Sequence, residues 1–238
     1  MSLTRKTGTV PVAGGELPYL LVIPDSGRGP GIVLCYEIFG LSQHMIERAE
    51  RLAGLGYVVM VPDFFWRIGP RQVVEELEPD GMQRAMHLGM QLDRETAAAD
   101  GAAALAHLRD QHEVSGGAGV FGYCMGGMIA YLIATRTRPE VAVLYYPSGV
   151  DGYLDRIHDI HCPTLYEFGA EDAFMPPDIA GRVREATAHL DGVQVEVQPG
   201  AGHAFDNDLL PQLHNADAAA AAWTDAQRFL GRWLPAGG

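Results

Sequence analysis

A cysteine stands between glycines in the segment GYCMGG at residues 122–127. The surrounding stretch, VFGYCMGGMIAYLIA, predicts a strand, a tight turn and a helix. A turn of this kind exposes its central side chain at the carboxyl end of a sheet, where the first N–H groups of the helix also point. We therefore predict that Cys124 is a thiol nucleophile. The alternative is a structural cysteine in a glycine-rich turn, because free cysteine often serves as a small apolar residue.

A nucleophilic thiol requires a base, and the base requires a group that holds its tautomer. His203 lies in QPGAGHAFDND, after the last predicted strand, and Asp172 lies in YEFGAEDAFMP, after an earlier one. The order Cys, Asp, His along the chain is that of α/β-hydrolase triads. Taken singly, Asp172 could be a solvated turn acid, and His203 is one of nine histidines.

A carboxylate at the end of an apolar strand is a further candidate. Glu37 closes the run PGIVLCYE, where burial of a charge is costly unless the charge is paired. Cys35 and Glu37 share one face of this strand, with Tyr36 on the other. Glu37 is either an acid that meets water at a strand end or a carboxylate that projects into an active site.

Strands that alternate with helices would position these residues. Short apolar runs predict strands, and amphipathic or alanine-rich stretches predict helices. The expected strands are 7–12, 17–24, 30–37, 57–63, 118–123, 141–147, 163–169 and 193–199, and the expected helices are 43–54, 93–111, 125–136, 178–190 and 217–233. Residues 64–91 are less regular and could form a loop and a short helix over a pocket. The pattern predicts an α/β fold, a mostly parallel sheet with helices on both faces, in a single domain over 1–238.

Composition limits the partners. The 238 residues carry a net charge of −13, which disfavours binding to nucleic acid. Three cysteines, an odd and sparse count, fit a reducing compartment. No apolar stretch approaches the length of a membrane span and no signal peptide is evident. We expect a cytoplasmic protein that does not bind a membrane, and a monomer or weak homodimer.

The motifs together resemble those of the dienelactone hydrolase family, cysteine-dependent α/β-hydrolases that act on ester and lactone bonds. The resemblance covers roughly residues 15–232. The resemblance rests on five segments: CYEIFG (35–40), VPDFF (61–65), GYCMGG (122–127), FGAEDAFMP (168–176) and GAGHAF (200–205). The family's fold and chemistry are thereby implied, with a small ester or lactone as substrate and no cofactor.

Carried over by motif, the resemblance implies that Cys124 is the nucleophile, His203 the base and Asp172 its orienter. It also implies an oxyanion hole from the backbone N–H groups of Ile38 and Met125. Glu37 would correspond to the family's glutamate beside the thiol. A nearby carboxylate raises a thiol pKa, so this residue could keep the resting thiol neutral and protect it from oxidation until substrate binds.

Two positions bear on the substrate. Family members that act on chloroaromatic breakdown products have an arginine four residues after the catalytic histidine, and this chain has Asn207 there, between two aspartates. Arg84 could match a second substrate arginine, in a region that aligns loosely. An anionic dienelactone is therefore less certain than a neutral ester or lactone, and a broad neutral carboxylesterase is an alternative.

Other classes share parts of the pattern. Glutamine amidotransferases also place a cysteine on such a turn, but they expect a late His-X-Glu, and this chain has Phe205 at the third position. A hydrolase-fold binding protein without activity is a further alternative. The segment HDIHC (158–162) invites a zinc site, but no second cluster completes one, so we expect no metal.

Overall fold

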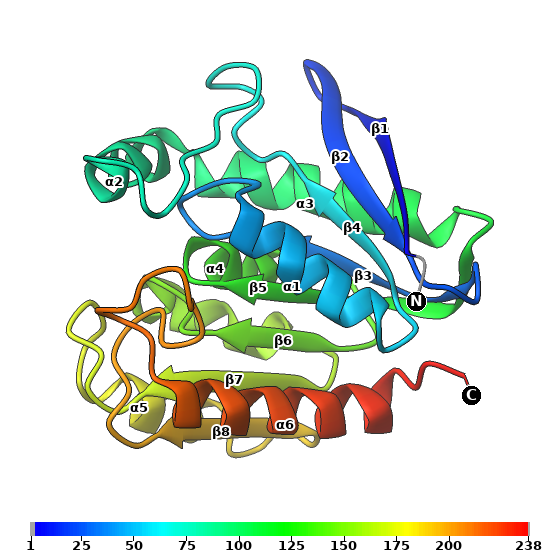
Figure 1. Cartoon of the computed structure of the whole chain (residues 1–238). Helices are drawn as coiled ribbons and strands as arrows, with labels where there is room; N and C mark the ends of the chain where they lie inside the picture. The colour runs from blue at the N-terminus through cyan, green and yellow to red at the C-terminus, as the bar shows by residue number, and fades with distance from the viewer. Residues whose placement is uncertain (1–2, 238) are drawn as a thin grey trace.

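An eight-stranded sheet forms the centre of the computed structural model, which describes residues 3–237 (Figure 1). The strands are β1 (Thr4–Val12), β2 (Gly15–Ile23), β3 (Gly29–Cys35), β4 (Val58–Pro62), β5 (Val114–Tyr123), β6 (Ala142–Tyr145), β7 (Thr164–Gly169) and β8 (Val193–Gln198). Their order across the sheet is β1-β2-β4-β3-β5-β6-β7-β8.

The sheet is mostly parallel. Strands β3 to β8 run in one direction, while β2 is antiparallel to both β1 and β4. The predicted strands 7–12 and 17–24 are present as β1 and β2, which form a hairpin with Val12 paired to Gly15. The predicted α/β class with a mostly parallel sheet is confirmed.

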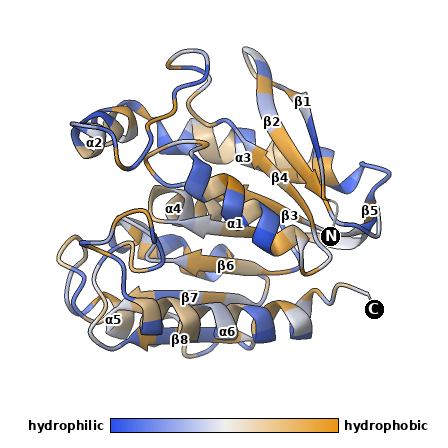
Figure 2. Ribbon diagram, in the orientation of Figure 1, coloured by the Kyte–Doolittle hydropathy of each residue, from blue (hydrophilic) through white to orange (hydrophobic). Residues whose placement is uncertain are grey.

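Helices cover both faces of the sheet. Helices α1 (Gln43–Ala53) and α6 (Ala216–Trp233) lie in front of it in Figure 1, and α3 (Arg94–Arg109), α4 (Met125–Ala134) and α5 (Ile179–Thr187) lie behind it. Every residue of β3, β4 and β6 is buried, which explains why these strands read as continuous apolar runs (Figure 2). Because β3 to β8 are parallel, their carboxyl ends lie at one edge of the sheet. The predicted functional residues lie in the segments that follow these strands, at the same edge.

The irregular region 64–91 contains a loop and the helix α2 (Gly81–Gln91), as expected from the sequence. One segment was not predicted, the 3-10 segment η1 (Val150–Asp159), which follows β6. Strand β3 ends at Cys35, so Glu37 lies just beyond the strand rather than within it. A long apolar helix able to cross a bilayer is absent from the described residues.

Candidate active site

The turn around Cys124 has the backbone geometry of a nucleophile elbow. Cys124 joins β5 to α4 with φ of 53°, a left-handed conformation that is unfavourable for a residue with a side chain. Glycine is required on both sides, because a Cβ at Gly122 would collide with the carbonyl of Gly126, and a Cβ at Gly126 with that of Cys35. The strained turn is fixed by hydrogen bonds from Cys124 N to Tyr145 O and from Ser148 N to Cys124 O.

The loop after β8 brings His203 to the thiol. His203 Nε2 is 3.0 Å from Cys124 Sγ, and His203 Nδ1 is 2.7 Å from Asp172 Oδ2. Asp172 lies in the loop after β7, and its Oδ1 accepts a hydrogen bond from Phe174 N at 2.9 Å. The carboxylate thus has its own anchor and fixes the imidazole orientation, with Nε2 directed to the sulfur.

The imidazole of His203 lies between the rings of Tyr146 and Phe174, with ring centroids 5.1 and 5.3 Å away. Burial lowers the pKa of His203, but the charge of Cys124 and the hydrogen bond to Asp172 outweigh it and raise the pKa to about 10. The surroundings therefore favour an imidazolium whenever the sulfur is a thiolate.

Glu37 is buried beside this pair and lines the same cavity as Cys124 and His203. Asn207 Nδ2 donates to its Oε2 at 2.9 Å, and the Tyr146 hydroxyl donates to its Oε1 at 3.3 Å. Burial raises the pKa of Glu37 to about 7, although the Asn207 hydrogen bond and the charge of His203 lower it. A carboxyl group with this pKa can take up or release a proton near neutral pH.

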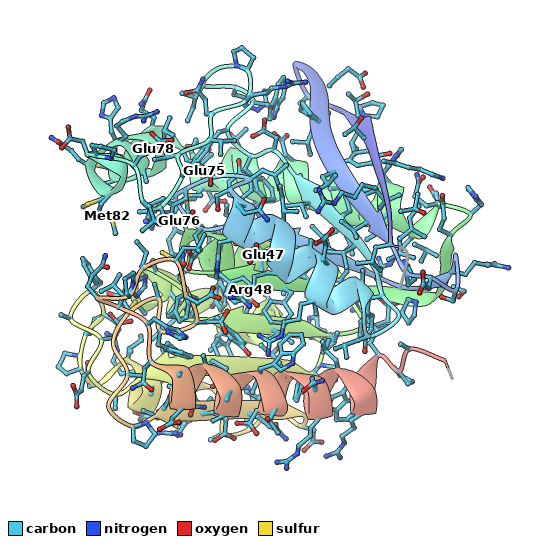
Figure 3. The ribbon with its side chains drawn as sticks, viewed as in Figure 1. Glu47, Arg48, Glu75, Glu76, Glu78 and Met82 are labelled. Atoms are coloured by element: carbon cyan, nitrogen blue, oxygen red, sulfur yellow. The ribbon has the colours of Figure 1, made fainter. Side chains whose placement is uncertain are left out.

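The acidic loop after His203 is tied to α1 and not to the cavity. Arg48, on α1, forms ion pairs with Asp206 at 3.1 Å and with Asp208 at 2.7 Å (Figure 3). Asn207 between them is fully buried and contacts Glu37. Neither aspartate is among the residues that line the cavity. The negative charge of this loop, which argued against an anionic substrate, is thus partly offset by Arg48.

Ser148 is a residue that the sequence did not suggest. Its Oγ is 3.3 Å from Cys124 Sγ and 3.3 Å from His203 Nε2, so the three atoms form a triangle. Ser148 follows β6 by three residues, in a loop where Tyr146 has φ of 35°. A chemically reactive residue after a parallel strand is a recognisable signal, but the loop conformation that turns this hydroxyl to the sulfur is not readable from residue types.

The cavity that contains Cys124 has a volume of about 250 Å³. Ile38 and Met125, whose backbone N–H groups the sequence suggested for an oxyanion hole, both line it. Met125 begins α4, so its N–H is among the helix donors that lack an intrahelical acceptor. The remaining wall is mainly apolar and comes from α2, from Phe174 and from the segment after His203.

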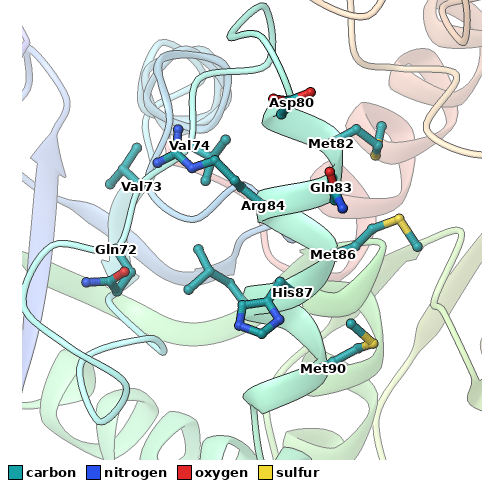
Figure 4. A pocket seen from close by; sticks show the side chains of 11 residues that line it. Gln72, Val73, Val74, Asp80, Met82, Gln83, Arg84, Met86, His87 and Met90 are labelled. Carbon is teal, nitrogen blue, oxygen red and sulfur yellow. The ribbon is translucent and has the colours of Figure 1, made fainter.

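The two predicted substrate residues lie outside this cavity. Arg84 is on α2, forms an ion pair with Glu78 and lines a second hollow with Val73 and Val74 (Figure 4). Three methionines of α2 line both this hollow and the Cys124 cavity, namely Met82, Met86 and Met90. Asn207 sits behind Glu37 and not in the cavity wall. The cation in the wall is instead Arg94, the first residue of α3, which is half-buried and packs beside Gly149. Arg94 stands at a helix start without a recognisable motif, so no residue pattern selected it in advance.

The zinc hypothesis for HDIHC has no support in the geometry. His158 and His161 are exposed, whereas Cys162 is buried and its Sγ is 3.8 Å from the Thr164 hydroxyl. Within residues 3–237, no group of three metal-ligating side chains comes together.

Comparison with known proteins places this site in a family. The model of the dienelactone hydrolase family matches residues 17–234. The chain belongs to the dienelactone hydrolase family. It is 32% identical to a carboxymethylenebutenolidase of Pseudomonas sp. strain P51 over 94% of this chain and 93% of that one. A carboxymethylenebutenolidase of Rhodococcus opacus is 31% identical over 98% of this chain and 91% of that one.

Solved structures agree with the dienelactone hydrolase fold. A dienelactone hydrolase-like promiscuous phosphotriesterase from metagenomic libraries has a TM-score of 0.80 at 22% identity, with 98% of this chain and 100% of that chain covered. A dienelactone hydrolase from Anabaena variabilis has a TM-score of 0.71 at 19% identity, covering 98% and 99% of the two chains. The prediction of a hydrolase of ester or lactone bonds is confirmed at the level of the family.

Proposed function

We propose that this chain hydrolyses a small ester or lactone through a Cys124–His203–Asp172 triad. The observation that carries the proposal is the aligned pair of contacts, Sγ to Nε2 at 3.0 Å and Nδ1 to Oδ2 at 2.7 Å, on a strained elbow that opens into a cavity. Family membership supports the reaction class.

The first half-reaction forms a thioester. When the substrate binds, the proton of the Cys124 thiol passes to the Glu37 carboxylate. The sulfur, now a thiolate beside the His203 imidazolium, attacks the carbonyl carbon of the substrate. The resulting oxyanion accepts hydrogen bonds from the N–H groups of Ile38 and Met125. When the tetrahedral intermediate collapses, the C–O bond to the leaving alkoxide breaks, and the His203 imidazolium gives its Nε2 proton to that oxygen.

The second half-reaction releases the acid. His203 takes a proton from water, and the hydroxide attacks the thioester carbonyl. Collapse breaks the C–S bond, and the sulfur leaves as a thiolate beside the imidazolium. Asp172 stays ionised throughout and stabilises that imidazolium. Glu37, with a pKa of about 7, would then return its proton to the thiolate and restore the resting thiol.

The test compares Cys124→Ala with Cys162→Ala, which removes a buried thiol remote from the elbow. We expect hydrolysis of phenyl acetate and of a dienelactone to fall by about 10³-fold or more in Cys124→Ala and to persist in Cys162→Ala. Intact-mass analysis after rapid acid quench should show an acetyl adduct on the wild type and on Cys162→Ala, and none on Cys124→Ala. Unchanged turnover in Cys124→Ala would overturn the proposed nucleophile.

A wild-type chain that is folded, and binds but does not turn over either substrate, would favour the binding-protein alternative. Circular dichroism and thermal unfolding of the same preparations separate this outcome from misfolding. The ratio of the two rates also distinguishes an anionic lactone from a neutral ester as the better substrate.

A further inference from the structure

Most of the large apolar side chains that are exposed within residues 3–237 gather around the Cys124 cavity. In the described part of the chain the exposed ones are Leu77, Met82, Met86, Met90 and Phe174. All of these except Leu77 line the cavity that contains Cys124. Their exposed fractions are high, with 75% for Met90 and 67% for Phe174. An apolar patch that gathers at the mouth of a site indicates a ligand or partner that covers it.

The three methionines form a stripe on α2. Met82, Met86 and Met90 follow one another at intervals of four residues, which places them on one side of the helix (Figure 4). Arg84 is directed away from that side, toward Val73 and Val74. The stripe is therefore an apolar face continuous with the cavity wall, and its methionines also border the neighbouring hollow that contains Arg84.

The helix is held directly over the reactive centre. A Cβ at Gly89 would lie 3.0 Å from Ile38 Cγ2 and 3.7 Å from Met125 Sδ, so the absence of a side chain at this position lets α2 approach both residues. Gly89 directly precedes Met90, so the Met90 end of the stripe lies near the two residues proposed for the oxyanion hole. Leu210 and Leu213 provide further apolar surface in the same cavity.

The cavity is small for its opening. Its volume of about 250 Å³ is below the range of roughly 300–1,000 Å³ that holds a drug-sized ligand. A compact acyl group fits within it, and a longer chain must continue outward over the methionines. Methionine suits this role, because its unbranched and polarisable side chain adapts to apolar chains of varied shape.

We propose that the substrate is an ester with an aliphatic chain, which extends from the carbonyl at Cys124 along Met82, Met86 and Met90. This inference rests on the proposed ester hydrolysis and specifies its substrate class. The chain could belong to the acyl group or to the alcohol, and the experiment separates these two sources.

The experiment measures kcat/KM for 4-nitrophenyl acetate, butyrate, hexanoate and octanoate below their critical micelle concentrations. A parallel series of n-alkyl acetates varies the alcohol instead. We expect kcat/KM to rise by roughly two- to fourfold per methylene over part of one series, since each methylene leaves water for the stripe. The series that rises identifies the part of the ester that lies on α2.

The test variant is the double replacement Met86→Gln and Met90→Gln, which keeps the length of both side chains. The matched control is Leu77→Gln, which alters an exposed apolar residue outside the cavity. The double variant should lose most of the gain with chain length, so that the ratio of kcat/KM for the longest ester to that for the acetate falls by about fivefold or more. The control should behave as the wild type in both series.

Flat or falling kcat/KM with chain length in both wild-type series would overturn the inference and leave the ester hydrolase intact. Hydrolysis that increases only when micelles or lipid vesicles are added would also overturn it, because the stripe would then bind a lipid–water interface and not the substrate chain. Acetate hydrolysis that survives Cys124→Ala, or is absent from the wild type, would instead reject the proposed function itself.

Discussion

The side-chain amide of Asn207 donates a hydrogen bond to the buried carboxyl group of Glu37 at 2.9 Å. This contact gives a structural reason for the asparagine at a position where we looked for a substrate arginine. Asn207 lies behind the cavity wall and acts on Glu37, so its effect on the substrate is indirect.

Replacement of Asn207 by leucine should shift the pH dependence of hydrolysis. The hydrogen bond from Asn207 lowers the pKa of Glu37, so its loss should raise that pKa above about 7. If ionised Glu37 accepts the thiol proton, the acidic limb of the kcat/KM profile moves upward by about one pH unit. The control is the same replacement in Glu37→Gln, where no such shift is expected. An identical shift in both backgrounds would contradict the link.

Glu37→Gln should change the pH dependence of stability. Burial raises the pKa of Glu37 to about 7, above the value near 4.3 of an unfolded glutamate. Between those pH values the folded chain binds a proton that the unfolded chain has released. The group therefore contributes stability at acid pH, and this contribution is lost as the pH rises through 7.

Urea unfolding at pH 5 and pH 8 measures this effect. The free energy of unfolding of the wild type, relative to Glu37→Gln, should fall by roughly 2–3 kcal/mol between the two pH values. Glu47→Gln, on the exposed side of α1, is the control and should show no comparable change. A difference between wild type and Glu37→Gln that is constant with pH would mean that Glu37 titrates normally.

Ser148→Ala should slow the reaction of Cys124 with iodoacetamide at pH 7. The Ser148 hydroxyl lies 3.3 Å from the sulfur and can donate a hydrogen bond to the thiolate. Loss of one such bond corresponds to about a fivefold effect. The difference should close at high pH, where the thiol is ionised in both proteins, and Ser148→Thr should restore the wild-type rate. Equal rates at every pH would show that the hydroxyl only fills space.

Asp172→Asn should lower kcat for ester hydrolysis by about 10²–10⁴-fold with little effect on the fold. The asparagine amide cannot replace the carboxylate that accepts the Nδ1–H of His203 at 2.7 Å. Glu171→Gln, the exposed neighbouring acid, serves as the control and should retain activity. A loss as large in the control would indicate that the loop and not the carboxylate is responsible.

Residues that directly follow parallel strands could be predicted from the sequence. Cys124, Asp172 and His203 meet because β5, β7 and β8 end at the same edge of the sheet. Their catalytic roles remain predictions. The three residues can be placed together because each follows a parallel strand, and the apolar runs in the sequence reveal those strands.

Side chains set by loop conformation could not be predicted. Ser148 reaches the sulfur through a loop in which Tyr146 has a positive φ, and nothing in residue type signals that. Arg94 enters the cavity because α3 begins beside Gly149, while Arg84 leaves it because α2 presents its apolar side inward. A helix in an irregular region can be expected, but its rotation about its own axis depends on packing that the sequence does not display.

The elbow also makes this chain a one-thiol protein in practice. Burial raises the pKa of Cys35 strongly and that of Cys162 to about 11, and neither lines the cavity. Cys124 alone combines a base at 3.0 Å with access from the cavity. A fluorescent electrophile added in slight excess should therefore label the native chain once, and the denatured chain at every cysteine. The stoichiometry of that label would count competent molecules in any preparation, without a substrate.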